Sequence, residues 1–192
     1  MRVAVIDESP SRAAVIREGL AALTDCEVFV LTERRGLIAR IAEIDPDIVL
    51  MDLGNPSRDV LEEYFTVSRV LARPIAMFVD QSDDESIVAS VEAGVSSYVV
   101  NGLAPQRIRA IVDLAVTRFN AFSRLQRDLE TAKGKLADRE TVDRAKRILM
   151  DSRGLAEPQA YAELRSTAMN QGKRIAEIAE AIVTAHKMMG RA

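Results

Sequence analysis

The sequence predicts an α/β domain with a parallel sheet, followed by a long helix and a small helical domain. Short apolar runs alternate with helical segments five times in the first half of the chain. The next stretch carries apolar residues at a helical spacing and has no glycine between Pro105 and Gly134. The charge changes too: residues 1–104 contain 9 Lys and Arg against 18 Asp and Glu, whereas residues 105–192 contain 17 against 11. A basic surface could meet an anionic polymer, or it could simply be a solvated face without a partner.

Five apolar runs are the predicted strands, at residues 2–6, 27–31, 47–51, 74–79 and 97–100. The predicted helices between them cover about 9–22, 36–44, 57–71 and 84–93, and a fifth helix begins after Pro105. Ser9 and Pro10 read as the N-cap and first turn of the first helix, and Gly94 as the C-cap of the fourth. Strands that are apolar throughout and alternate with helices indicate a parallel sheet covered on both faces.

Acidic residues follow two of these strands. Asp7 and Glu8 follow the first strand, and Asp52 follows the third. In an open parallel sheet the ligand crevice lies at the carboxyl ends of the strands, so the three carboxylates would converge if the two strands are neighbours. Clustered carboxylates suit a hard cation such as Mg²⁺. The alternative is that strand ends are acidic only because loops are polar.

Composition narrows the function classes. Cys26 and His186 are the only residues of their types, so an internal disulfide is excluded and a Ser-His-Asp triad or multi-histidine metal site is improbable. No stretch approaches the roughly 20 apolar residues that span a bilayer, and the N-terminus does not read as a signal peptide. We expect a cytoplasmic protein with no catalytic output.

A heptad series favours a dimerisation helix over residues 105–136. Apolar residues step by three and four along this stretch, interrupted by Arg118, at Ile108, Ile111, Ala115, Phe122, Leu125, Leu129, Ala132 and Leu136. Sustained spacing of this kind is typical of a coiled coil, most simply a parallel homodimer. A long amphipathic helix packed on its own domain is the alternative.

Residues 137–192 read as three helices. The first continues the long helix to about Ser152 and ends at Gly154, the second begins at Glu157, and the third runs from Lys173 to about Met188. The predicted core consists of Val142, Ile148, Leu149, Leu155, Leu164, Ile175, Ile178 and Ile182. Basic groups that bind phosphates and one aromatic that could stack on an unpaired base lie around it, at Arg139, Arg144, Lys146, Arg147, Arg153, Tyr161, Arg165, Lys173 and Arg174.

The segments VIDES, VLMDL and EAGVSSYVV resemble a response-regulator receiver domain, assigned here to residues 1–104. The resemblance implies a flavodoxin-like (βα)₅ fold, Mg²⁺ held by Asp7, Glu8 and Asp52, and Asp52 as the phosphoacceptor. Two positions depart from the pattern. Val79 stands where a hydroxyl residue contacts the phosphoryl group, and Asn101 stands where a lysine pairs with its charge. Neither replacement supplies the charge-assisted contacts that give a phosphoryl group its ordering power, and Asp80 adds a negative charge nearby.

The segments DRAKRILM, RGL, AYAELR and TAMNQ resemble the ANTAR domain of transcription antiterminators, across about 136–184. The family commonly has glycine where this chain has Arg147. The resemblance, most of all to NasT-type regulators of nitrate assimilation and their relative AmiR, implies binding to hairpins in nascent leader RNA. It also implies a NasS-type nitrate-sensing partner that sequesters the regulator.

The leading interpretation is therefore a dimeric RNA-binding antiterminator, switched by partner release or by phosphorylation. A DNA-binding response regulator is the first alternative, and it would need base-reading polar side chains near the start of a recognition helix. A protein-interaction adaptor that binds no nucleic acid is the second.

Overall fold

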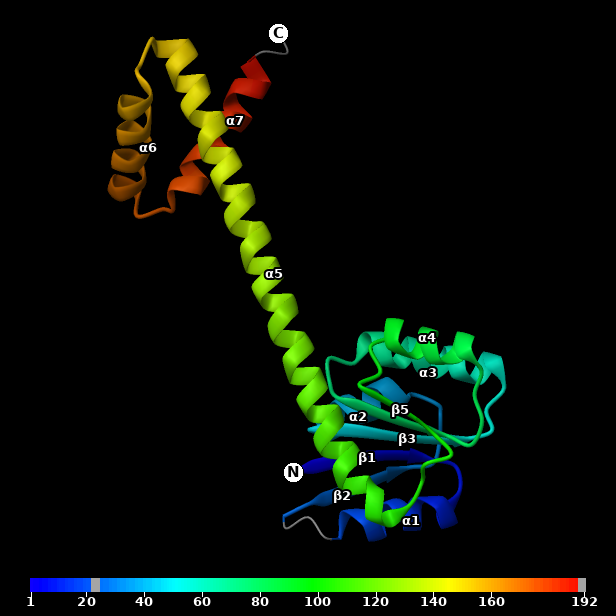
Figure 1. Cartoon of the computed structure of the whole chain (residues 1–192). Helices are drawn as coiled ribbons and strands as arrows, with labels where there is room; N and C mark the ends of the chain where they lie inside the picture. Colours follow the sequence, from blue (N-terminus) through cyan, green and yellow to red (C-terminus); the bar gives the residue numbers. More distant parts are fainter. Residues whose placement is uncertain (22–24, 190–192) are drawn as a thin grey trace. The chain divides into compact units, whose positions relative to one another are not determined.

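The computed structural model describes residues 1–21 and 25–189. The chain forms two compact units, which divide after Arg124. The predicted boundary after residue 104 lies earlier, because the next helix contributes its first turns to the core of the first unit. Figure 1 shows the elements of both units, coloured along the chain.

The first unit is built on a five-stranded parallel sheet in the order β2-β1-β3-β4-β5. The strands are β1 (Arg2–Asp7), β2 (Glu27–Leu31), β3 (Ile48–Gly54), β4 (Ile75–Val79) and β5 (Ser97–Val100). β1, β3 and β4 are almost completely buried, which explains their continuous apolar sequences. The predicted strands and parallel topology are confirmed, although β3 runs three residues further than predicted.

Five helices cover the two faces of the sheet (Figure 1). They are α1 (Pro10–Leu20), α2 (Leu37–Ile44), α3 (Arg58–Val70), α4 (Asp84–Glu92) and the start of α5 (Pro105–Arg153). Buried residues of α1 and α5 share one core cluster with the sheet, and those of α2 and α3 share the other. The predicted end of the first helix at Ala22 lies outside the described residues.

The first turns of α5 are part of this core, which corrects the predicted dimer seam at three positions. Ile108, Ile111 and Ala115 are buried against the sheet and α1. The two helices approach closely at Gly19, where a Cβ would lie 2.6 Å from Ile108 Cγ1. A spacing of three and four residues suits a helix on a sheet as well as a helix in a coiled coil, so the heptad pattern could not separate the two.

The second unit contains the rest of α5, then α6 (Glu157–Gln171) and α7 (Ile175–Met189). Its core holds Leu149, Leu164 and Ile178 with small alanines, and the remaining predicted core residues pack around them. Gly154 and Gly172 follow α5 and α6 with positive φ, where glycine avoids a steric clash. No helix in the described part of the chain is long and apolar enough to cross a membrane.

Candidate functional sites in the two units

An acidic hollow lies at the carboxyl ends of β1 and β3 in the first unit. Asp7 and Asp52 are register partners at the ends of these adjacent strands. Both are among the few buried charged residues of the chain. They line a hollow of about 280 Å³ together with Glu8, Arg12 and Arg34. The strand order thus brings Asp7 and Asp52 together, as the sequence predicts.

Arg12 enters this hollow from α1 and contacts two carboxylates. Its Nε donates to Asp52 Oδ2 at 2.8 Å, and its Nη2 donates to Asp52 Oδ1 at 2.5 Å. Its Nη1 donates to both carboxylate oxygens of Asp80, at 3.0 and 3.1 Å. These bonds raise the pKa of Arg12 above its ordinary value, the bond to Asp52 most of all. The guanidinium therefore remains charged and offsets the negative charge that Asp80 adds.

Sequence reasoning missed Arg12. Its signal was a basic residue in the first turn of a helix that begins at the carboxyl end of β1. Side chains of a helix tilt toward its N-terminus, so this position aims back over the ends of the strands. Asp80 is held beside β3 independently, because its backbone N–H donates to Gly54 O at 2.7 Å.

Asp7 has only one of its carboxylate oxygens bonded. Oδ1 accepts the backbone N–H of Ser9 at 2.7 Å, whereas Oδ2 is buried without a hydrogen-bond partner. Burial raises the pKa of Asp7, and the nearby charge of Asp52 acts in the same direction.

The residues of this hollow do not fit the Mg²⁺ that the family implies. Glu8, the third predicted ligand, pairs with Arg34, and both oxygens of Asp52 accept from Arg12. Within residues 1–21 and 25–189, no three His, Cys, Asp or Glu side chains are placed to hold a metal ion. Asp7 Oδ2 is the one buried carboxylate oxygen here that would be open to a cation.

Val79 and Asn101 flank this site at the ends of β4 and β5. Val79 is buried, and Asn101 is exposed with φ +49°. The Asn101 backbone N–H donates to Val79 O at 2.8 Å, which joins the two strand ends. At both positions the side chain lacks the chemistry of the expected hydroxyl and lysine.

In the second unit, the predicted RNA-binding residues do not form one cluster. Arg139, Lys146, Tyr161 and Arg174 line a hollow of about 420 Å³ formed by α5, α6 and α7. Arg153 and Lys173 line another hollow, of about 600 Å³, over α6 and α7. Arg144, Arg147 and Arg165 are exposed and line neither hollow.

Ion pairs separate the predicted RNA-binding residues into paired and unpaired groups. Lys146 Nζ lies 2.8 Å from Asp143 Oδ1 and 2.7 Å from Glu157 Oε1, and its side chain is only 16% exposed. Lys146 is therefore less available to a phosphate than the other members of the predicted RNA-binding set. Arg153 pairs with Glu163, and Arg174 pairs with Asp138 and Glu177. Arg139, Arg144, Arg147, Arg165 and Lys173 form no ion pair within the described residues, so they are better placed to receive phosphates.

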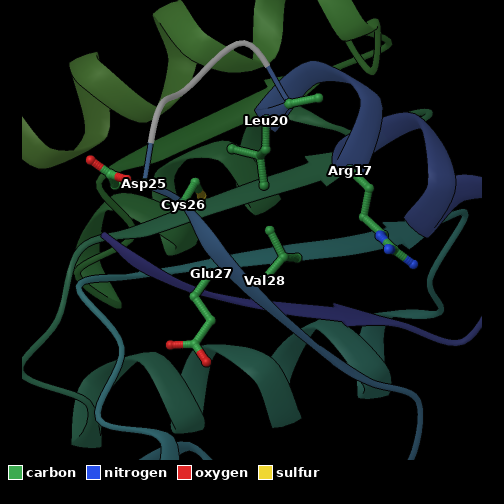
Figure 2. Close-up of a pocket in the computed structure, with 7 residues that line it drawn as sticks. Arg17, Leu20, Asp25, Cys26, Glu27 and Val28 are labelled. Atoms are coloured by element: carbon green, nitrogen blue, oxygen red, sulfur yellow. The ribbon is translucent and has the colours of Figure 1, made fainter.

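A further hollow, of about 590 Å³, lies between the end of α1 and the start of β2. Figure 2 shows Arg17 and Leu20 entering from α1, with Cys26 and Val28 opposite, while the carboxylates of Asp25 and Glu27 point away from Arg17. Burial raises the pKa of the Cys26 thiol. The charged groups of Arg17, Asp25 and Glu27 point in different directions, so they do not converge on a ligand in this hollow.

Comparisons with known proteins match the second unit by itself and the chain as a whole. Residues 130–183 match the ANTAR domain family. The chain is 26% identical over 174 residues to the transcriptional regulatory protein PdtaR of Mycobacterium tuberculosis, covering 88% of this chain and 85% of that protein. It is 32% identical over 76 residues to the nitrate regulatory protein of Klebsiella oxytoca, covering 40% of this chain and 19% of that protein.

A solved structure supports the fold of the first unit. A CheY-like response regulator receiver domain from Methanospirillum hungatei matches with a TM-score of 0.53 at 16% identity, over 62% of this chain and 96% of that one. The first unit therefore has the fold of a CheY-like receiver domain, and the second unit contains the segment that matches the ANTAR domain.

Proposed function

We propose that this ANTAR response regulator is an RNA-binding transcription antiterminator, which acts by binding rather than by catalysis. The observation that carries the proposal is the ANTAR match over residues 130–183, the same segment that carries exposed arginines on the surface of a folded three-helix unit. By stabilising one hairpin of a nascent leader transcript, such a protein would prevent a terminator from forming. This action would take place in the cytoplasm, where nascent transcripts are made.

Exposed arginines suit this task for an electrostatic reason. Basic side chains that contact phosphates release condensed counterions, which supplies most of the non-specific affinity. Arg139, Arg144, Arg165 and Lys173 have no competing ion pair within the described residues. Tyr161 is 46% exposed beside Arg139, where it could stack on an unpaired base.

The active form is proposed to be a homodimer that pairs through the middle of α5. Phe122, Leu125, Leu129 and Leu136 lie at the heptad spacing and are between 50% and 66% exposed. A row of large apolar side chains at this spacing is unfavourable in water and would be buried by a second copy of the same helix.

The switch is proposed to be release from a sensor protein, rather than phosphorylation of Asp52. Arg12 occupies both oxygens of that carboxylate, and neither Val79 nor Asn101 can bind a phosphoryl group by charge. Control of nitrate or nitrite assimilation genes, with a NasS-type nitrate sensor as the partner, is the most specific form of this proposal. It is supported by the likeness to the nitrate regulatory protein and by the sequence resemblance given above.

The test is an anisotropy titration of the full chain with a labelled RNA of two tandem hairpins and with a DNA duplex of matched sequence. Both titrations are run at two salt concentrations, with and without acetyl phosphate and Mg²⁺. We expect binding that prefers RNA, weakens with salt and does not respond to the phosphoryl donor. Equal binding to RNA and DNA would favour a DNA-binding regulator, and no binding to either would favour an adaptor.

A further inference from the structure

We propose that Arg12 is a resident cation that takes the place of a divalent metal in the acidic hollow and closes Asp52 to phosphoryl donors. This inference concerns the first unit alone and does not depend on RNA binding. The receiver-type fold implies a metal ion among these acids, whereas Arg12 already pairs with Asp52 and Asp80.

The contacts of Arg12 satisfy the carboxylate that a metal and a phosphoryl group would both need. Nε and Nη2 bind the two oxygens of Asp52 as a parallel pair, which is the strongest geometry between a guanidinium and a carboxylate. The backbone N–H of Gly54 adds a third, longer contact to Asp52 Oδ1 at 3.4 Å. Both oxygens of this buried side chain therefore have at least one donor.

The same guanidinium links a second acid to the first. Nη1 bonds both oxygens of Asp80, and that residue is fixed beside β3 by its backbone bond to Gly54. One arginine thus joins α1 to the ends of β3 and β4. Arginine suits this role because its charge is permanent and its planar group presents several donors in fixed directions.

A metal could enter only by undoing these contacts. Mg²⁺ requires oxygen ligands in a nearly octahedral arrangement. Asp52 would have to exchange its bonds with Arg12 for the ion, and Glu8 would have to leave Arg34. The displaced guanidinium would then stay close to a divalent cation of the same sign. Phosphoryl transfer meets the same obstacle, since the attacking oxygen of Asp52 would have to leave Arg12 and the metal ion that bridges the transferred group would lack its ligands.

The experiment is a titration of the full chain with Mn²⁺, followed by electron paramagnetic resonance of the free ion. It compares the wild type with Arg12→Gln and with the matched control Arg17→Gln, which removes an exposed arginine from the same helix. Asp52→Asn is made in each background to identify binding at this site. We expect the Asp52-dependent affinity for Mn²⁺ to be at least about tenfold higher in Arg12→Gln than in the wild type or the control, a difference of ~1.4 kcal/mol.

A second readout is acyl phosphate at Asp52, measured by mass spectrometry after incubation with acetyl phosphate and Mg²⁺. We expect it in Arg12→Gln and not in the wild type. Arg12→Lys provides a folded alternative if Arg12→Gln does not fold, because lysine keeps the charge but cannot bond both oxygens of Asp52 side by side. Asp52-dependent Mn²⁺ binding of equal strength in the wild type and the variants would overturn the proposal. So would the absence of any gain in a folded Arg12 variant.

Discussion

The guanidinium of Arg12 bonds both oxygens of Asp52, with Nε 2.8 Å from Oδ2 and Nη2 2.5 Å from Oδ1. The side chain of Asp52 is fully buried, while that of Arg12 is partly exposed. Removing Arg12 and removing the charge of Asp52 therefore have different consequences for the remaining partner. Without Arg12 a buried carboxylate is unpaired, whereas without the charge of Asp52 the arginine keeps Asp80 and some contact with water.

This asymmetry gives the first prediction. Arg12→Gln should lower the free energy of unfolding of the first unit by about 3 kcal/mol, because breaking a buried pair leaves an uncompensated charge. Asp52→Asn should cost distinctly less. Urea denaturation followed by circular dichroism measures both, and the double variant should recover part of the loss of Arg12→Gln. Equal costs for the two single variants would contradict this account.

The unbonded oxygen of Asp7 gives a prediction about pH. Its pKa is raised by burial, with Asp52 and Glu8 adding to the rise and Arg12 opposing it. The charged form therefore destabilises the fold above the raised pKa, and this penalty disappears as the pH falls and Asp7 binds a proton. Asp7→Asn should add about 1 kcal/mol of stability at neutral pH. The gain should shrink on acidification, as measured by thermal unfolding in chelator-treated buffer across a pH series.

The close approach of α1 and α5 gives a steric prediction. A Cβ at Gly19 would lie 2.6 Å from Ile108 Cγ1 and 2.7 Å from the backbone oxygen of Pro105. Gly19→Ala should therefore destabilise the first unit by about 2 kcal/mol through overpacking. Gly134→Ala is the matched control, since it meets open space in the middle of α5. It should raise helix stability by about 1 kcal/mol. Changes of the same sign in both variants would contradict the packing argument.

The exposed heptad residues give a prediction about assembly. Replacing Leu125 and Leu129 with serine should abolish or strongly weaken the dimer, because it removes the apolar surface that a second helix would bury. The control variant replaces Gln126 and Glu130 with serine. These exposed residues have the same spacing but lie outside the apolar row. Sedimentation equilibrium measures the oligomeric state of the wild type and of both variants. A wild-type chain that stays monomeric, or a serine variant that still dimerises, would remove the proposed seam.

The ion pairs of the second unit refine the RNA prediction. Arg144→Ala with Arg147→Ala should reduce RNA affinity and lower the slope of affinity against salt by about 1 to 2, because each phosphate contact contributes roughly 0.7–0.9 to that slope. The control pair Lys133→Ala with Lys135→Ala removes the same charge from exposed positions outside the predicted set. Identical losses in both pairs would indicate a general charge effect instead of a binding face. Lys146→Ala should act mainly by removing the ion pairs with Asp143 and Glu157, and not by removing a phosphate contact.

Runs of apolar residues predicted the strands well. The runs at 27–31 and 97–100 match the edge strands β2 and β5 residue for residue, although both carry partly exposed side chains. The inner strands β1, β3 and β4 are almost completely buried, and their continuous apolar runs predicted them to within three residues. The pattern was less informative in α5. Ile111 and Leu125 occupy equivalent heptad positions, yet one is buried in the first unit and the other is exposed. Only three-dimensional packing distinguishes these environments.

The candidate site shows a similar division. The acids Asp7 and Asp52 could be predicted because strand order places the ends of β1 and β3 side by side. The role of Arg12 could not, since it depends on the direction of a long side chain from a neighbouring helix. In the second unit, sequence alone grouped all the basic residues together, whereas acidic partners on neighbouring helices pair with Lys146, Arg153 and Arg174.

The burial of Ile108, Ile111 and Ala115 in the first unit has a practical consequence for dissecting the chain. A fragment that stops at residue 104 would leave part of one apolar face of the sheet, the part that α5 covers beside α1, open to water, so it should aggregate or remain insoluble when expressed alone. A fragment of residues 1–124 retains its own covering helix. Binding studies on the isolated first unit should therefore use the longer fragment. If the shorter fragment failed to bind a partner, the cause would be the missing helix of its core and not the partner.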